Sequence, residues 1–372
     1  MSLLDLEPCT LHAYTITTGE HLYRLPYGSA QWQESIKQPG SMSCTVPLSR
    51  EAKRLDLWAT LRPWKCLLAL QRGRSVIHAG PLTDLQWDAG SRSLSLTCGG
   101  GLTLLTKRLV LNSALKDGWR DGTVLVDEEH PAANMTLAWK RTWWWVVVCR
   151  LIIETKKWED LPIDLPAIQE PGDKQRAYFA WDLATVADRI CDIMNLSGGN
   201  EISFDPYLTA DGHLRYRMRA GTPELITATH MWNTTLPDSR VDLESVSGSG
   251  SNLTTQVWAT GGKNDDRTLM CRRTAQTLDG YPLMQTADTS HTTVERLSTL
   301  QQHAMGRLAA GCWPDETFTL KVGEEWTPHV GDHAITRVSD DYLGDQTLEL
   351  KITDISGDTG SDLLTVTCKE VV

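Results

Sequence analysis

One stretch of this chain occurs twice, close to its two ends. Residues 82–98 read LTDLQWDAGSRSLSLTC and residues 352–368 read ITDISGDTGSDLLTVTC, and they align without a gap with eight of seventeen positions identical. About one identity is expected from average residue usage. Each copy reads as a strand, an Asp-x-Gly-Ser turn and a second strand. The repeat therefore predicts a duplicated β-domain with one copy at each end, the alternative being two unrelated hairpins that share turn chemistry.

The remaining sequence is arranged around this repeat. Short alternating runs between Gly-rich turns fill the first hundred residues, which is typical of a small barrel or sandwich. Apolar side chains recur at helical spacing over 183–194, and the stretch from Ser245 to Ser251 has the composition of a linker. The fold class that we predict is mainly β with some α, with two similar β-barrels flanking a mixed α/β middle domain. The expected domains are a β-barrel over 1–105, the middle domain over 106–245 and a second β-barrel with one inserted helix over 246–372.

Charge is concentrated in the last third of the chain. The net charge of the 372 residues is −11, and residues 241–372 contribute −10 of it, with 10 basic and 20 acidic side chains. A protein that holds double-stranded DNA tightly is normally basic, so such binding is not expected. We expect an acidic surface on the C-terminal barrel, which includes five carboxylates that either face a channel or keep an outer surface soluble: Asp315, Glu316, Asp340, Asp341 and Asp345.

Nine cysteines are scattered without any C-x-x-C spacing, which predicts free thiols in a reducing compartment rather than a disulfide framework or zinc ribbon. Cys98 and Cys368 occupy equivalent repeat positions and are expected in equivalent cores, far apart and unbonded. The N-terminus does not read as a signal peptide. The apolar run Trp143–Ile153 is much shorter than the ~20 residues of a membrane span. We interpret it as a strand buried on both faces or as part of a subunit interface, and favour the interface because Trp is enriched there.

No catalytic, cofactor-binding or metal-binding residues are predicted, and the chain is not expected to be an enzyme. The sequence lacks the G-x-S-x-G, P-loop and H-E-x-x-H motifs. His329 and His333 have the spacing of helical metal ligands, but Pro328 and Gly331 argue against a helix there. Asp127–His130 reads as a solvated loop. Arg215, Arg217 and Arg219 alternate along one strand face, which is either a solvated face or a contact with an acidic partner.

The order of short motifs resembles the minor tail proteins of actinobacterial siphoviruses that serve as the baseplate or tail-tip hub. The motifs that carry the resemblance are V-P-L at 46–48, L-x-x-W at 61–64, R-G-x-x-V-I-H-A-G at 72–80, F-D-P-x-L-x-x-D-G-H-L-x-Y at 204–216, V-W-A-T-G-G at 257–262 and Y-P-L at 281–283. They run along nearly the whole chain as an order of elements. The Trp-rich stretch 139–158 has no counterpart in that pattern.

The resemblance implies a structural protein of the bacteriophage virion, made in the host cytoplasm and located at the tail tip. It implies two similar β-barrels in each chain and a homotrimer whose six barrels form a pseudo-six-fold ring. The implied partners are the tail tube and distal tail protein above the ring, tip or fibre proteins below it, and DNA that passes through the channel without specific binding. No cofactor or membrane insertion is implied. The alternative that we retain is a receptor- or carbohydrate-binding tail protein, because Trp and Tyr are abundant.

Overall fold

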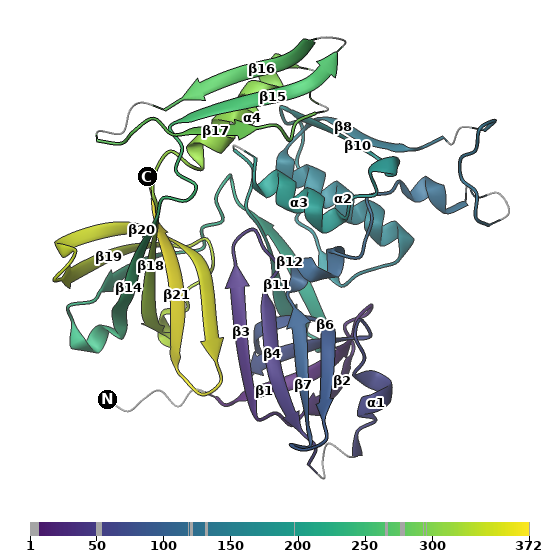
Figure 1. The fold of residues 1–372 in the computed structure, drawn as a ribbon. Helices are drawn as coiled ribbons and strands as arrows, with labels where there is room; N and C mark the ends of the chain where they lie inside the picture. Colours follow the sequence, from purple (N-terminus) through teal and green to yellow (C-terminus); the bar gives the residue numbers. More distant parts are fainter. Residues whose placement is uncertain are drawn as a thin grey trace.

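A computed structural model gives the fold of the chain. It describes residues 7–49, 54–117, 119, 122–130, 133–196, 198–264, 267–275, 280–292, 294 and 296–371. The fold is mainly β, as predicted. Two β-rich lobes lie side by side, a mixed middle region packs against them, and a small α/β module stands at the top of Figure 1.

The N-terminal lobe contains seven strands and one short helix. The elements are β1 (Cys9–Thr15), β2 (His21–Leu25), β3 (Ser29–Ser35), β4 (Ser41–Pro47), α1 (Leu57–Thr60), β5 (Cys66–Arg72), β6 (Ser75–Asp88) and β7 (Ser93–Gly99). Neighbouring strands pair antiparallel in the order β3, β4, β7, β6, β5, β1, β2. Alternate residues of β4 and β7 point inward, so Met42, Cys44, Leu94, Leu96 and Cys98 are buried together in the core of this lobe.

The C-terminal lobe repeats much of this plan. Its elements are β13 (Thr229–Asn233), β14 (Val241–Ser249), β18 (Asp315–Gly323), η6 (Glu324–Trp326), β19 (His333–Asp340), β20 (Gly344–Asp358) and β21 (Leu363–Glu370). The strand order β14, β18, β21, β20, β19 matches β3, β4, β7, β6, β5 of the N-terminal lobe, and these pairs are antiparallel. One difference is that β13 pairs with β19 in parallel, whereas β1 pairs with β5 antiparallel.

The two copies of the sequence repeat form the same hairpin. The β6–β7 ladder slips between Leu82 and Asp84, and the β20–β21 ladder slips at the equivalent place, between Ile352 and Asp354. The skipped residue is a threonine in both. Oγ1 of Thr83 donates to the carbonyl of Thr97 at 3.1 Å, and Oγ1 of Thr353 donates to that of Thr367 at 3.2 Å. A β-bulge at the same position of both hairpins is not required by their similar turn residues. The repeat is therefore a structural duplication rather than a coincidence of turn residues.

A single ladder joins the two lobes. The C-terminal half of β20 pairs antiparallel with β3, from Asp354 opposite Ser35 to Asp358 opposite Gln31. This junction merges the strands of both lobes into one thirteen-stranded sheet, in which β20 lies between β21 and β3 at the centre of Figure 1. Trp32 of β3 packs against the cores of both lobes.

The middle region covers one side of the N-terminal lobe. Its elements are η2 (Gly101–Leu105), η3 (Ser113–Asp117), β8 (Thr136–Thr142), α2 (Trp144–Trp158), β9 (Ile163–Asp164), β10 (Lys174–Phe179), α3 (Val186–Met194), β11 (Ile202–Leu208) and β12 (Leu214–Ala220). Its core is continuous with residues of β1, β5 and β6, including Tyr14, Leu67 and Ala79. The mixed α/β character therefore agrees with the sequence interpretation, but this region shares its largest core with the N-terminal lobe.

The interpretation of Trp143–Ile153 as a strand is wrong, because Trp144–Trp158 forms α2. Val146, Val147, Val148 and Cys149 are fully buried in the core of the middle region, so the apolar side chains are covered within the chain itself. A run that is apolar on every face has no period that separates a buried strand from a buried helix, and here tertiary packing overrides the strand preference of valine.

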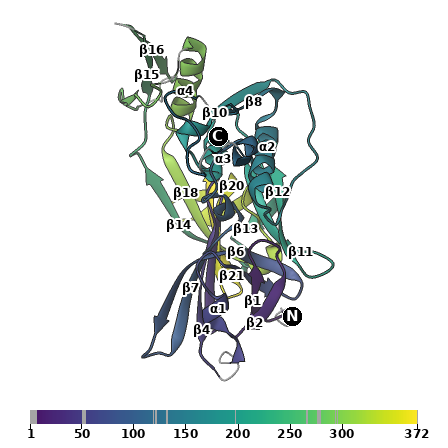
Figure 2. The ribbon, with the colours of Figure 1, turned by 90° about the vertical axis from the view of Figure 1, so that its right-hand side faces the viewer.

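A small α/β module is inserted into the C-terminal lobe between β14 and β18. It contains β15 (Gln256–Asn264), β16 (Arg267–Thr274), β17 (Gln285–Asp288) and α4 (Leu297–Ala309) around a core of its own. Figures 1 and 2 both place it at the top of the molecule, away from the N-terminal lobe. The linker interpretation of Ser245–Ser251 is wrong over 245–249, which belong to β14. The C-terminal sheet also contains β13 and most of β14 before residue 246.

All nine cysteines are free in the structure. Cys98 and Cys368 lie opposite Leu82 and Ile352 in the two equivalent hairpins, and each is buried in its own lobe core. Burial raises the pKa of both thiols above their ordinary value, and that of Cys368 to about 12. Both side chains therefore act as small apolar core residues.

Candidate functional site

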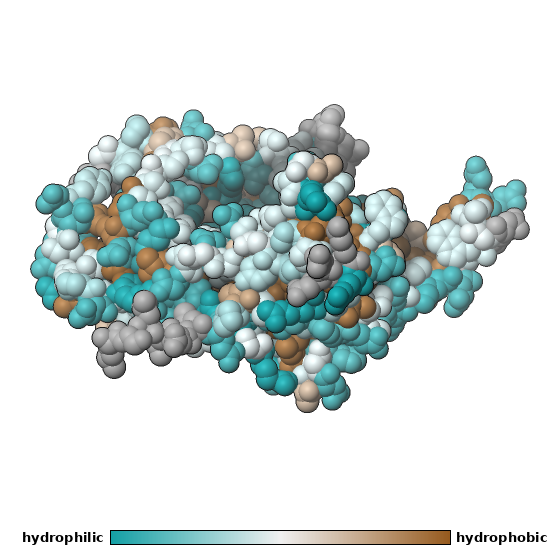
Figure 3. Space-filling view, turned by 90° about the horizontal axis from the view of Figure 1, so that it is seen from below, coloured by the Kyte–Doolittle hydropathy of each residue, from teal (hydrophilic) through white to brown (hydrophobic). Residues whose placement is uncertain are grey.

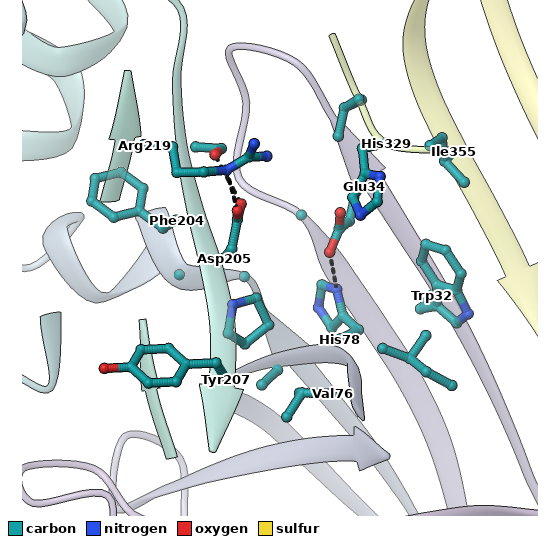
Figure 4. Close-up of a pocket in the computed structure, with 18 of the residues that line it drawn as sticks. Trp32, Glu34, Val76, His78, Phe204, Asp205, Tyr207, Arg219, His329 and Ile355 are labelled. Atoms are coloured by element: carbon teal, nitrogen blue, oxygen red, sulfur yellow. Dashed lines mark hydrogen bonds and ion pairs between the residues drawn. The ribbon is translucent and has the colours of Figure 1, made fainter. Parts of the chain in front are cut away.

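A cleft of 550 Å³ opens where the two lobes meet the middle region. Figure 4 shows the side chains that surround it: Trp32 and Glu34 on β3, Val76 and His78 on β6, Phe204, Asp205 and Tyr207 on β11, Arg219 on β12, His329 in the loop before β19, and Ile355 on β20. Three parts of the chain that are distant in sequence thus converge on one place, which makes this cleft the candidate site to examine chemically.

On the N-terminal side of the cleft, a buried histidine links three strands. The Nε2–H of His78 donates to the carbonyl of Gly99 at 3.1 Å, and its Nδ1 lies 3.5 Å from Oε1 of Glu34. His78 is on β6, Glu34 is on β3 and Gly99 is the last residue of β7. The imidazole therefore links β6 to β3 and to the end of β7, and Figure 4 shows it pointing toward Glu34.

On the side of the middle region, carboxylates and guanidiniums are paired. Arg219 contacts Asp205, and Arg215 makes two hydrogen bonds to Asp164 at 2.8 and 2.6 Å. Hydrogen bonds from Arg215 lower the pKa of Asp164 despite its partial burial. Arg217 lies over the ring of Tyr207 at 4.8 Å. All three arginines of β12 therefore have partners within the chain, and the acidic-partner interpretation is not needed to explain them.

On the side of the C-terminal lobe, Asp332 is completely buried just before β19. It accepts hydrogen bonds from the backbone N–H groups of Thr227, Ala228 and His329 at 2.7, 2.9 and 3.1 Å. Two imidazoles also contact it, Nε2 of His230 at 3.1 Å and Nδ1 of His329 at 3.7 Å. Burial opposes its charge, but these bonds prevail and hold its pKa well below the usual range. The hydrogen bond to Asp332 raises the pKa of His329.

Further ion pairs hold the three parts together. Arg72 at the end of β5 contacts Glu324 of the C-terminal lobe. Lys351 of β20 lies 2.7 Å from Glu201 and 2.9 Å from Glu224, which flank the β11–β12 hairpin of the middle region. These pairs are partly shielded from water, so each costs more to break than a surface pair.

Of the charged side chains that line the cleft, Asp205 and Arg219 pair within one wall, whereas Arg72 and Glu324 pair between the two lobes. Perturbed pKa values mark functional sites only probabilistically, since structural ion-pair networks perturb them as well. His329 and His333 do not form a metal pair, because His329 contacts Asp332 whereas His333 contacts Glu224 at 3.0 Å. Within the described part of the chain, no cluster of three or more His, Cys, Asp or Glu side chains could hold a metal ion. The arrangement fits a structural junction between lobes.

The other residues singled out from the sequence lie away from this cleft. Asp127–His130 is an exposed loop closed by the contact of His130 with Asp127, in agreement with its interpretation. All five acidic side chains considered for a channel are exposed, and two of them have basic partners, Asp315 with Lys369 and Asp345 with Arg337. Which of these carboxylates face a channel stays a prediction.

Sequence reasoning missed the residues that build the junction. His78 lies inside the quoted R-G-x-x-V-I-H-A-G motif, but nothing in a single sequence pairs it with Glu34. Asp332 lies between His329 and His333, which were weighed as metal ligands, and it contacts His329 and His230 instead. The position of Asp332 directly before a strand was the only available signal.

Seen from below, the molecular surface is largely hydrophilic. Figure 3 shows hydrophobic side chains in several separate patches on this face rather than in one continuous surface. None of the described helices combines the length and apolar character that crossing a membrane requires. This face therefore does not support assembly through one broad apolar surface.

Comparison with known proteins identifies the fold. No family model matches the chain, and no curated protein matches its sequence. The solved structures that match over nearly the full length of both chains include a tail protein from Neisseria meningitidis (15% identity, TM-score 0.58, covering 98% of this chain and 97% of the other), the 43 kDa tail protein of prophage MuSo2 from Shewanella oneidensis (12%, 0.55, 98% and 98%) and the prophage tail protein gp18 from Listeria monocytogenes (9%, 0.54, 97% and 94%). The chain has the fold of phage tail proteins.

Proposed function

We propose that this chain is the structural baseplate hub, a minor tail protein, of a siphovirus tail tip. Three copies would form a ring that joins the tail tube and distal tail protein to the tip proteins below. The duplication of the hairpin and its strand order within one chain is the observation that carries the proposal. A chain with two equivalent lobes presents six from three copies, which matches a three-fold tip to a six-fold tube.

The contacts of the cleft support a structural role rather than catalysis. Ion pairs at and beside the cleft join the two lobes to each other and the C-terminal lobe to the middle region, as a load-carrying ring component requires. The acidic excess of the C-terminal third would repel the DNA backbone and let DNA pass through the ring without sticking. A purely solubilising outer surface is the competing explanation of that charge.

Cryo-electron microscopy of the purified tail tip tests the proposal. We expect three copies of this chain, with N-terminal and C-terminal lobes alternating around the channel below the tube. One copy, six copies, or absence of the chain from purified tails would contradict it. The position of Asp315 and Asp345 relative to the channel tests the role of the acidic side chains separately.

The receptor- or carbohydrate-binding alternative rests on exposed aromatic side chains. Trp58, Trp181 and Tyr342 are the most exposed, but they lie on separate elements of the three parts of the chain. A saccharide site normally needs such rings gathered on one face. Titration of the purified protein with host-wall glycans tests this alternative, and saturable tight binding would favour it.

A further inference from the structure

The ladder that joins the two lobes within one chain has a second, unused counterpart. In the occupied junction, β3 covers the outer edge of β20 over residues 354–358. The N–H of Ile36 donates to the carbonyl of Thr353 at 2.8 Å, and that of Thr359 donates to Ala30 at 3.0 Å. In an antiparallel strand the backbone N–H and C=O groups of successive residues point alternately to its two sides. The backbone groups of Ile355 and Gly357 therefore also face β3.

Strand β6 presents the same edge without a partner. The repeat aligns residues 84–88 with 354–358, and the shared bulge places both segments at the same point of their hairpins. Within the described residues, β6 pairs with β5 only up to Pro81 and with β7 beyond the bulge, so no strand covers the outer edge of 84–88. Asp84 and Gln86 are exposed, whereas the equivalent Asp354 and Ser356 are partly buried by β3.

Strand β14 is the counterpart of β3 and also has an open edge. Trp32 pairs with Met42, which pairs with Cys98; Val246 pairs with Phe318, which pairs with Cys368. This alignment makes Val246 equivalent to Trp32 and Ser249 equivalent to Ser35. Of the described strands, only β18 pairs with β14. In Figure 1 β14 lies in the left-hand lobe and β6 lies toward the right of the other lobe.

We propose that β6 of one chain pairs antiparallel with β14 of the next chain, in the register of the internal junction. Asp84 would lie opposite Ser249, Gln86 opposite Ser247 and Asp88 opposite Ser245. The partner is a second copy of this chain, since each copy carries one edge of each kind. Such a head-to-tail contact is heterologous and can close into a ring in which internal and external junctions alternate. This proposal rests on the proposed hub function and specifies the interface that it needs.

The side chains at the two junctions are complementary in the same way. In the internal junction the large Trp32 lies opposite Gly357, where an added Cβ would be 3.0 Å from the indole. In the external junction the equivalent pair is Val246 and Trp87, so the large side chain lies on the other strand. Trp87 is opposite Leu94 and therefore on the core-facing side of its strand, yet it is 46% exposed. A neighbouring β14 would cover it.

A polar contact is also preserved. Oγ of Ser35 donates to Oδ1 of Asp354 at 2.5 Å across the internal junction. The equivalent residues of the external junction are Ser249 and Asp84, which have the same chemistry. Neither open edge contains a lysine or proline, the residues that commonly protect strand edges from pairing.

Engineered cross-linking tests the register. Residues 86 and 247 would form a pair whose backbone groups point away from each other, where Cα atoms lie about 4.5 Å apart and a disulfide is feasible. The full-length chain carrying Gln86→Cys and Ser247→Cys is oxidised at high concentration and run on a non-reducing denaturing gel. We expect covalent multimers. The matched control combines Gln86→Cys with Ser245→Cys, which places the cysteine on the same strand face but two residues out of register, and should stay uncross-linked.

A second pair of variants tests the role of the exposed indole. Trp87→Lys should weaken self-association about tenfold or more in analytical ultracentrifugation, because a charge would be buried at the junction. Trp58→Lys is the matched control, since Trp58 is 78% exposed on α1 and lies outside both edges, and it should leave association unchanged. Thermal unfolding of both variants checks that each is folded.

The two proposals fail in different ways. Trimers in which the 86–247 pair does not cross-link, or in which only the displaced pair does, would overturn the strand pairing and leave the hub function standing. A chain that stays monomeric and uncross-linked at its highest soluble concentration would also overturn the pairing. Absence of the chain from purified tails would instead overturn the hub function.

Discussion

The two lobes follow one plan and, besides the direction of β13, differ in three places. Both contain the bulged hairpin with its buried cysteine, flanked by corresponding strands. In the N-terminal lobe the connection between β3 and β4 is short and covers residues 36–40. The equivalent connection of the C-terminal lobe, residues 250–314 between β14 and β18, contains a complete α/β module. The hairpin is therefore the invariant unit, and loops at its periphery accept large insertions.

The second difference is electrostatic. Cys66, the first residue of β5, is equivalent to Asp332, which directly precedes β19, and both are completely buried. Cys66 packs in the apolar core of its lobe, whereas Asp332 holds backbone groups and His230 by hydrogen bonds. The third difference is that β20 has a neighbour on its outer edge and β6 does not. The same strand arrangement thus accommodates either an apolar or a polar side chain at this buried position. It also accommodates an outer strand edge that is either paired, as in β20, or unpaired, as in β6.

The largest expected loss of stability comes from replacing the buried Asp332. Asp332→Ala should destabilise the chain by about 3–5 kcal/mol, because the N–H groups that it satisfies would be buried without a partner. Cys66→Ala is the comparison in the other lobe and removes only one small apolar group. Chemical denaturation measures both, and an Asp332→Ala loss no larger than that of Cys66→Ala would contradict the assignment.

The same comparison has a pH dependence with a definite sign. The pKa of Asp332 is lowered in the folded chain, so its stabilising contribution is complete above the unfolded-state value of about 3.9 and is lost as the pH falls below it. The stability difference between the unmodified chain and Asp332→Ala should therefore shrink on acidification below about pH 4. A constant difference across that range would contradict it.

Removing the aromatic side chain from the filled junction should have the next largest effect. Trp32→Ala should cost about 3 kcal/mol, since Trp32 packs against both lobe cores. Trp87→Ala, the change at the open edge, should cost only about 1 kcal/mol in the isolated chain because its side chain is half exposed. Equal losses in thermal denaturation of the monomer would show that the two edges do not differ as described.

A smaller effect is expected at the glycine beneath Trp32. A Cβ at Gly357 would lie 2.9 Å from Cδ2 of Leu364 and 3.0 Å from Nε1 of Trp32, so Gly357→Ala should cost about 1–3 kcal/mol through overpacking. Gly248→Ala on β14 meets nothing within 4 Å and should be close to neutral in the isolated chain. Denaturation midpoints of the two variants measure the contrast, which a neutral Gly357→Ala would remove.

The smallest predicted effect tests the equivalence of the bulges. Thr83→Val and Thr353→Val each remove one side-chain hydrogen bond to a carbonyl and should each cost about 1 kcal/mol. The two losses should agree, because the bonds have the same geometry in the two hairpins. A large loss at one site with none at the other would show that the bulges make unequal contributions.

Some of the fold could be predicted from particular residues. The eight identities between 82–98 and 352–368 revealed the duplicated hairpin, because turn residues and alternation act locally along a strand. The helix around Ile190 was predicted from its period, although α3 begins at Val186, after the Leu183 expected within it. In contrast, the strand alternative for Trp143–Ile153 and the linker interpretation of Ser245–Ser249 are wrong. Continuous apolar and Ser/Gly-rich segments carry no period, so their neighbours decide the outcome.

The sequence by itself determined the mainly β character, the two copies of the hairpin and the equivalence of Cys98 with Cys368, since all of these follow from local pattern and internal comparison. Only the tertiary structure decided that β3 pairs with β20, that Glu34 meets His78 and that Asp332 becomes a buried node. Those contacts join residues far apart in the chain, and their free energy depends on burial and on partners that no local pattern specifies. The same physics leaves the outer edge of β14 and that of β6 over 84–88 without a strand partner among the described residues of one chain.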